Sequence, residues 1–390
     1  MEQNLARKNK TTLYALGIKF LSINAILQIF QSLVPLIMQR DLQISELWIG
    51  VVTGGVNLIV CLMLLAFSKM KHTINMLLAF SMVLSVSLIV TPLSVKHQSN
   101  ILFVLMFCVG MMTLSFIKVL ANDFTLQVAP AGRENGAIAL TKITSTLGGL
   151  VALIIMFFLR DEYVFYAMGL LNIVAAVVLF YLRSNIRERA ENGDESKRQG
   201  NDIGVIRKRA IVLIIILLCY TVYDVMLSTF SRYAANVWSM ENNEFAIYQS
   251  ICLVAAFIAY IPIGKWANEK NQKNFTIIGL ILMAVGLFAI GQFAKFHFSV
   301  IVFFVLIGVG WAAIAVNIMP ILVRGAMHEE VSRLVSYYSV MSNISLVMAP
   351  IISGFVLEYL SYRSLYPILA GILIIATCLL FVVECKDEKQ

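Results

Sequence analysis

The chain has 390 residues, of which 60% are hydrophobic and only 13% are charged. Soluble domains are nearer half apolar and a quarter charged, so this composition excludes an ordinary soluble domain. The net charge of +8 does not indicate nucleic-acid binding, because the basic residues lie in short segments between apolar runs and form no stripe on a folded basic domain.

The chain begins with a polar segment that is followed directly by a long apolar run. Arg7, Lys8 and Lys10 precede an apolar stretch that continues to Met38. A secretory signal has an apolar core of only about 7–15 residues, followed by a cleavage site. We therefore expect an uncleaved first membrane span.

Further apolar segments follow along the chain, each long enough to cross a bilayer, which takes about 20 residues. Backbone N–H and C=O groups find no water in hydrocarbon, so each segment must be a helix. The sequence therefore predicts an all-α polytopic membrane protein with 12 transmembrane helices. Their expected limits are 12–38, 46–68, 73–94, 99–121, 136–160, 163–183, 210–235, 244–266, 275–294, 298–322, 332–357 and 363–384.

Lys and Arg are concentrated in alternate connections between these segments. Cytoplasmic loops carry such an excess, and the pattern fits twelve spans with both termini in the cytoplasm. We expect a multi-pass protein of a bacterial cell membrane, embedded in the lipid bilayer as a monomer.

One long polar segment, which contains RERAENGDESKRQGND, divides the spans into six and six. The sequence predicts an N-terminal six-helix bundle over 1–183, a charged cytoplasmic linker over 184–209 and a C-terminal six-helix bundle over 210–390. Glu46 and Glu244 occupy matching places before the second span of each half. Duplicated halves are typical of secondary transporters.

Two ionisable residues of the seventh span are candidates for function, because a charge is costly in lipid. Asp224 lies about 14 residues, or roughly 21 Å, into this span, too deep for its short side chain to reach the headgroups. It suits proton coupling or substrate binding, the alternative being a structural hydrogen bond. Arg232 would bind an anionic or hydroxylated substrate, but extension to the outer surface is the preferred interpretation.

Three lysines lie within spans, near their cytoplasmic ends: Lys19, Lys118 and Lys142. Long basic side chains reach from such positions to the membrane interface. This is the preferred interpretation for Lys19 and Lys142.

Uncharged polar and aromatic side chains complete the candidate set. Asn24, Gln28 and Gln31 share one face of the first span. Their amides fit hydroxyl-bearing solutes, and hydrogen bonding between helices is an equal alternative. Four further candidates, for which ordinary packing is preferred, are Tyr220, Tyr223, Trp311 and Asn317.

Several kinds of chemistry find no support in the sequence. It contains no phosphate-binding P-loop, no metal-ligand cluster and no nucleophile–base arrangement in the spans. We expect no ATP-driven transport within this chain, no cofactor, no metal site and no enzymatic activity.

Four stretches resemble the major facilitator superfamily, and the resemblance extends over nearly the whole chain. They are SLVPLIMQRDLQISELWIGVV (32–52), NDFTLQVAPAGRENGAIAL (122–140), GVGWAAIAVNIMPIL (308–322) and APIISGFVLEYLSYRSLYPI (349–368). Within the superfamily the chain is most similar to bacterial glycoside–cation and sucrose–proton symporters. The resemblance implies an inner gate formed by Asp123 and Arg133.

The chain departs from the family pattern at its signature loops. The loop AFSKMKHTIN after the second span has neither aspartate nor arginine, and in the second half Asn268 stands where an aspartate is usual. Leu114 occupies the place of a family arginine, and Lys118 lies one turn later on the same face. We therefore expect a weakened or rewired gate that includes Asn268, and we place Lys118 among the coupling or substrate-binding candidates.

Together these features predict a secondary active transporter that moves a small solute, by resemblance a sugar or glycoside, by alternating access. Protons or another cation would drive it. One alternative is export of amphipathic compounds or a metabolite, which a site rich in aromatic and Met side chains would favour. Another is a membrane sensor with the same fold that does not transport.

Overall fold

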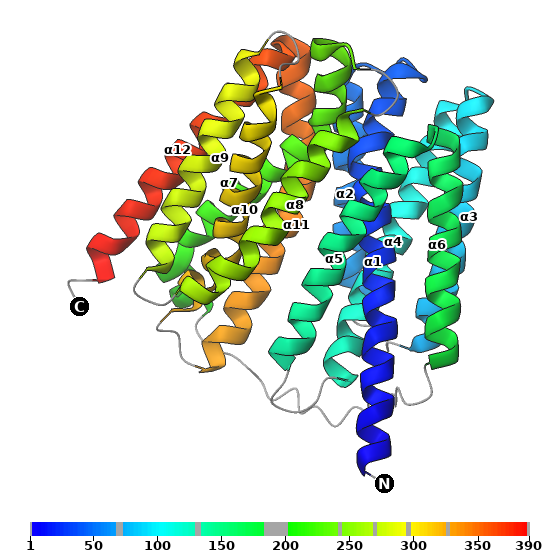
Figure 1. The fold of residues 1–390 in the computed structure, drawn as a ribbon, viewed down its shortest axis with the longest axis horizontal. Helices are drawn as coiled ribbons and strands as arrows, with labels where there is room; N and C mark the ends of the chain where they lie inside the picture. Colours follow the sequence, from blue (N-terminus) through cyan, green and yellow to red (C-terminus); the bar gives the residue numbers. More distant parts are fainter. Residues whose placement is uncertain are drawn as a thin grey trace. The chain divides into compact units, whose positions relative to one another are not determined.

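The computed structural model describes residues 2–67, 73–128, 134–182, 202–240, 244–267, 271–293, 298–324 and 328–387. Within these ranges the chain forms twelve α-helices and no strand (Figure 1). The helices are α1 (Glu2–Arg40), α2 (Glu46–Phe67), α3 (Ile74–Lys96), α4 (Asn100–Val128), α5 (Glu134–Phe158), α6 (Asp161–Leu182), α7 (Asp202–Trp238), α8 (Phe245–Trp266), α9 (Gln272–Gln292), α10 (Val300–Val323), α11 (His328–Tyr359) and α12 (Tyr362–Asp387).

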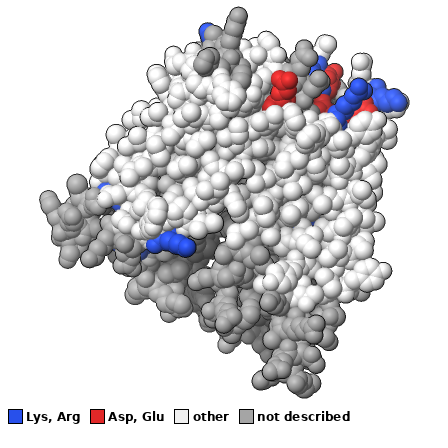
Figure 2. All heavy atoms as spheres, viewed as in Figure 1, with Lys and Arg blue, Asp and Glu red and all other residues white. Residues whose placement is uncertain are grey.

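Most of the described helices are long and apolar enough to cross a membrane. Eleven of them contain a stretch that is able to cross a bilayer, and in α5 the apolar part, Ile143–Phe158, is shorter. Many Leu, Ile, Val and Phe side chains are exposed along the helices, and Figure 2 shows a face on which uncharged side chains predominate. So large an apolar exterior needs lipid around it. The protein is therefore a multi-pass membrane protein.

The chain forms two compact units. Unit 1 comprises Met1–Ile44 and Gly55–Asn192, and unit 2 comprises Ser45–Gly54 and Gly193–Gln390. The first turns of α2 thus belong to unit 2 although the rest of the helix belongs to unit 1. Of the linker expected over 184–209, the part before residue 202 lies outside the described residues, and α7 begins within the remainder.

Five helix pairings of unit 1 recur in unit 2. In unit 1, α1 packs on α4, α5 and α6, while α3 packs on α4 and α6. In unit 2, α7 packs on α10, α11 and α12, while α9 packs on α10 and α12. Each of these pairings recurs six helices later, so the two units are pseudo-symmetric. The predicted fold class is confirmed.

The start of α2 lies directly against α11 within unit 2. A Cβ atom added to Gly50 would lie 2.4 Å from the backbone oxygen of Pro350, and one added to Gly354 would lie 2.7 Å from that of Glu46. Backbone atoms cannot rotate away as a flexible side chain does. Glycine at positions 50 and 354 is what allows these helices to approach so closely.

This close approach predicts opposite outcomes for two Gly→Ala substitutions. Gly354→Ala is expected to cost about 1–3 kcal/mol of stability through overpacking. Gly371→Ala, where an added Cβ meets nothing within 4 Å, is expected to add about 0.5–1 kcal/mol because alanine favours the helix. Thermal unfolding of the two variants in detergent measures the difference. Equal midpoints would show that the α2–α11 approach is looser than described.

Candidate functional site

Asp224 lies near the middle of the span Arg209–Trp238 of α7, and its side chain is 9% exposed. The hydroxyl of Ser345, from α11, donates a hydrogen bond to Asp224 Oδ2 at 2.6 Å. Ser345 is itself fully buried. Hydrogen bonds to an ionised carboxylate are among the stronger ones in proteins, so α11 supplies a partner that the sequence did not reveal.

Aromatic rings from three helices gather around the part of α7 that carries Asp224. Tyr223 stacks flat on Trp311 of α10, with ring centroids 3.8 Å apart and an interplanar angle of 3°. Tyr220 meets Trp311 edge-on at 5.1 Å and Tyr338 of α11 at 5.8 Å. The hydroxyls of Tyr220 and Tyr338 also hydrogen bond to each other. Three aromatic candidates from the sequence therefore lie together, and Tyr338 joins them.

We refer to this group as the Asp224 cluster, which consists of Asp224, Tyr220, Tyr223, Trp311, Tyr338 and Ser345. All six residues belong to unit 2. Tyr220 and Tyr338 are half-buried, while the other members are buried. The cluster therefore places the carboxylate of Asp224 and the half-buried tyrosines 220 and 338 within unit 2.

Asn317, the remaining candidate on α10, uses its amide within its own helix. Its Nδ2 donates to the backbone oxygen of Ala313 at 2.8 Å. Its Oδ1 is buried and has no hydrogen-bond partner among the described residues. An unpaired buried acceptor is costly, and no contact described for Asn317 brings it into the Asp224 cluster.

The amides of the first span are partly engaged inside unit 1. Asn24 donates to Ser145 of α5 at 2.9 Å, and Gln28 donates to Ser32 of α1 itself at 2.9 Å. Gln31 is half-buried, and its side chain makes no hydrogen bond within the part of the chain that the structure describes. On the face predicted from helical spacing, Asn24 and Gln28 therefore make hydrogen bonds within unit 1, and Gln31 remains available.

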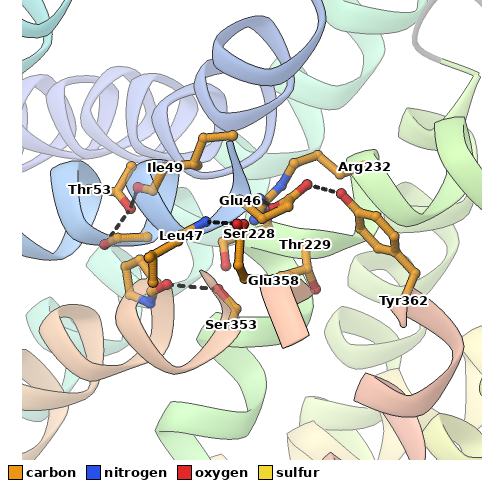
Figure 3. A network of polar contacts seen from close by, with 12 residues as sticks. Glu46, Leu47, Ile49, Thr53, Ser228, Thr229, Arg232, Ser353, Glu358 and Tyr362 are labelled. Carbon is orange, nitrogen blue, oxygen red and sulfur yellow. Dashed lines mark hydrogen bonds and ion pairs between the residues drawn. The ribbon is translucent and has the colours of Figure 1, made fainter. Parts of the chain in front are cut away.

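Arg232 belongs to a second group of interacting polar side chains in unit 2. Its side chain is 2% exposed and forms an ion pair with Glu46. Figure 3 shows Glu46 between Arg232 and Tyr362, whose hydroxyl donates to the other carboxylate oxygen. Arg232 Nη2 also donates to Ser228 O at 3.3 Å. Arg232 therefore does not extend to the outer surface, because its charge is balanced by Glu46 inside the unit.

The N-terminus of α2 fixes the position of this ion pair. Glu46 is the first residue of α2, where a negative side chain is favoured by the helix dipole. The next backbone N–H, of Leu47, donates to Glu358 of α11 at 3.2 Å (Figure 3). Two carboxylates thus lie at the positive end of α2. The sequence singled out Glu46 as a landmark but gave no signal for its partner, 186 residues away.

Lys19 contradicts the preferred interpretation that it reaches the membrane interface. Its side chain is fully buried in unit 1, and its Nζ donates to Asn172 Oδ1 of α6 at 2.6 Å. The Asn172 amide donates in turn to Ser81 O and Ser85 Oγ of α3, at 2.7 and 2.8 Å. Among the described residues no carboxylate pairs with Lys19. The amine therefore ties α1 to α6 and α3 as a hydrogen-bond donor.

This arrangement predicts that Asn172 matters more than the lysine charge. Lys19→Met is expected to stay within about 1 kcal/mol of the wild type, because removing a buried amine offsets the lost hydrogen bond. Asn172→Leu leaves that amine without its acceptor and is expected to cost about 1–3 kcal/mol. Thermal unfolding in detergent ranks the two variants. A Lys19→Met variant that is the less stable of the two would contradict this account.

The remaining candidates lie in α4 and α5 or outside the described residues. Lys118 of α4 is exposed, and Asp123 of the same helix is half-buried. Lys142 lies in α5, and its side chain is outside the described part of the chain. Arg133 and Asn268 also lie outside the described residues, so the gate predicted from the resemblance remains a prediction.

Comparison with known families identifies the fold. The family model described as Major Facilitator Superfamily matches residues 28–241 and 212–390. The chain belongs to the Major Facilitator Superfamily. No curated protein matches it, so the branch of the Major Facilitator Superfamily to which it belongs is still a prediction.

Solved transporter structures share this fold over almost the whole chain. A bacterial homologue of the human lysosomal transporter Spinster is 12% identical, with a TM-score of 0.75 over 97% of this chain and 96% of its own. The nucleoside transporter NupG is 14% identical, with a TM-score of 0.75 over 95% and 98% of the two chains. The POT family transporter PepTSo is 12% identical, with a TM-score of 0.73 over 98% and 99%. At these identities the likeness shows a Major Facilitator Superfamily transporter fold.

Proposed function

We propose that this protein is a secondary active transporter that moves a small solute by alternating access, coupled to protons or another cation, with Asp224 as the coupling residue. The carboxylate of Asp224, 9% exposed at the middle of a membrane span, carries the proposal. Carboxylates in such places are costly and mark ion and substrate pathways. The fold and the transporters that share it agree with this function.

Asp224 has the surroundings of a group that exchanges a proton. Its hydrogen-bonding neighbour Ser345 can donate to the carboxylate or accept from the protonated acid. Tyr220 and Tyr223 lie near it on α7, and Tyr338 of α11 hydrogen bonds to Tyr220. Arg232, further along α7, is held by Glu46. Movement of the two proposed bundles, 1–183 and 210–390, would expose the carboxylate to each side of the membrane in turn.

Two solute classes follow from the sequence, and the Asp224 cluster favours one of them. The resemblance to sugar symporters points to a sugar or glycoside, which amide side chains would bind. Rings dominate around Asp224, while Asn317 bonds to its own helix and Asn24 to α5. An aromatic site with few available amides favours the alternative, transport of an amphipathic compound.

Transport by the purified protein in liposomes tests the proposal. A ligand screen by thermal unfolding first selects solutes that stabilise the protein. We expect a selected solute to accumulate when a proton gradient is imposed, in liposomes with protein and not in empty ones. A folded, ligand-binding protein that moves no selected solute in either direction would favour the non-transporting sensor instead.

A further inference from the structure

The Asp224 cluster joins a carboxylate to aromatic rings, and this combination has a specific chemical preference. The face of an aromatic ring is negative and attracts a cation within about 6 Å of its centre, with tryptophan the strongest. Here Trp311 and three tyrosines gather around the part of α7 that carries Asp224. Carboxylate and rings attract the same kind of ligand.

We propose that the solute is an organic cation, an alkylamine or quaternary ammonium that carries an apolar group, and that the Asp224 cluster binds it. The inference rests on the transport function proposed above and names its substrate class. The carboxylate balances the charge of the solute, and the rings of Tyr220 and Tyr338, both half-buried, meet its alkyl groups.

The charges of unit 2 argue against an anionic solute at the same place. Arg232, two turns from Asp224 on α7, is the cation that would attract an anion. Its guanidinium is paired with Glu46 and bonded to Ser228 O. Withdrawing it would leave the carboxylate of Glu46, which is only 11% exposed, without its arginine partner, which is costly.

The absence of an amide from the cluster as defined argues against a sugar. Sugar hydroxyls need donors and acceptors arranged around them, and amides supply both. Asn317 Nδ2 is bonded to Ala313 O of its own helix. The polar groups that the cluster presents beside its rings are the carboxylate of Asp224 and the hydroxyls of Ser345, Tyr220 and Tyr338.

Two probes that share a phenyl ring separate the classes: benzyltrimethylammonium, which is cationic, and phenyl β-glucoside, which is neutral. Their binding to the purified full-length protein is measured by calorimetric titration. We expect the wild type to bind benzyltrimethylammonium and Asp224→Asn to bind it at least about tenfold more weakly, with a loss of about threefold to tenfold in Trp311→Leu. Asp224→Glu, which keeps the charge, should bind it more tightly than Asp224→Asn.

Matched substitutions outside the cluster serve as controls. Trp266→Leu removes an exposed tryptophan of α8, and Asp161→Asn removes a carboxylate of unit 1. Both should bind benzyltrimethylammonium within about twofold of the wild type, because neither residue touches the cluster. If Asp224→Asn does not fold, the test is the difference in benzyltrimethylammonium binding between Trp311→Leu and Trp266→Leu.

The outcomes distinguish this inference from the transport function on which it rests. Equal binding by the cluster variants and the controls overturns the cation site, as does a wild type that binds only the glucoside. If the protein transports a glycoside and binds no cation, the cation site is wrong and the proposed transport function stands. A protein that binds the cation at Asp224 and Trp311, yet transports nothing, loses the function alone.

Discussion

Asp224→Asn is expected to reduce solute accumulation driven by a proton gradient to the level of empty liposomes. Asparagine keeps the shape of the side chain and still accepts a hydrogen bond from Ser345, but it cannot take up or release a proton. Exchange of solute across the membrane without a gradient should continue, once the solute is raised about tenfold to offset weaker binding. Radiolabelled solute in liposomes measures both processes.

Asp161→Asn provides the control for this variant, because Asp161 is a carboxylate of unit 1 that pairs with Arg40. It should accumulate solute as the wild type does. If Asp224→Asn still accumulated solute at the wild-type level and with the same dependence on pH, Asp224 would have no part in the coupling mechanism. Loss of exchange even at saturating solute would assign Asp224 a role in the conformational change itself.

Arg232→Met is expected to lower the free energy of unfolding by about 3–5 kcal/mol, the usual cost of breaking a buried ion pair on one side. Glu46 then loses its arginine partner at 11% exposure, and the hydrogen bond from Tyr362 does not replace that positive charge. Arg40→Met is the matched control, since that arginine is 48% exposed. Surface ion pairs of this kind contribute about 0–1 kcal/mol. Thermal unfolding in detergent compares the two variants.

A combined variant distinguishes the cost of leaving one charge unpaired from the cost of losing the side-chain packing. Replacing Arg232 and Glu46 by Met and Tyr362 by Phe removes the ion pair together with the tyrosine hydroxyl that is bonded to it. Apolar replacements of a buried ion pair are often neutral or stabilising, so this triple variant should recover most of the stability lost in Arg232→Met. A triple variant as unstable as the single one would show that packing, and not the unpaired carboxylate, causes the loss.

The spans and their division into two sets of six were predictable, because they follow from the lengths of the apolar segments and of the polar segment between them. Because the surrounding lipid is apolar, a run of about 20 apolar residues predicts a membrane-spanning helix even when its neighbours are unknown. The depth of Asp224 followed in the same way, from its distance along α7. Its aromatic neighbours Tyr220 and Tyr223 lie on the same helix and were therefore visible too.

Contacts between helices were beyond the sequence, because they depend on how each helix is rotated and on what packs against it. Lys19 shows this most clearly: its place along α1 suits an interfacial lysine, but its side chain is directed at Asn172 of α6. The partner of Arg232 is Glu46, which enters unit 2 only because Gly50 and Gly354 let α2 approach α11. No local pattern in the sequence signals any of these pairs.

Solvent access to the Asp224 cluster is the most direct test of the central claim that this cluster lines a solute passage. A single cysteine at position 338, in a background with the six native cysteines replaced, is treated with a water-soluble maleimide. We predict labelling that slows when a transported solute is added, whereas a cysteine at the fully buried position 280 of α9 stays unlabelled. A cysteine at 338 sealed from both aqueous compartments under every condition would contradict the account.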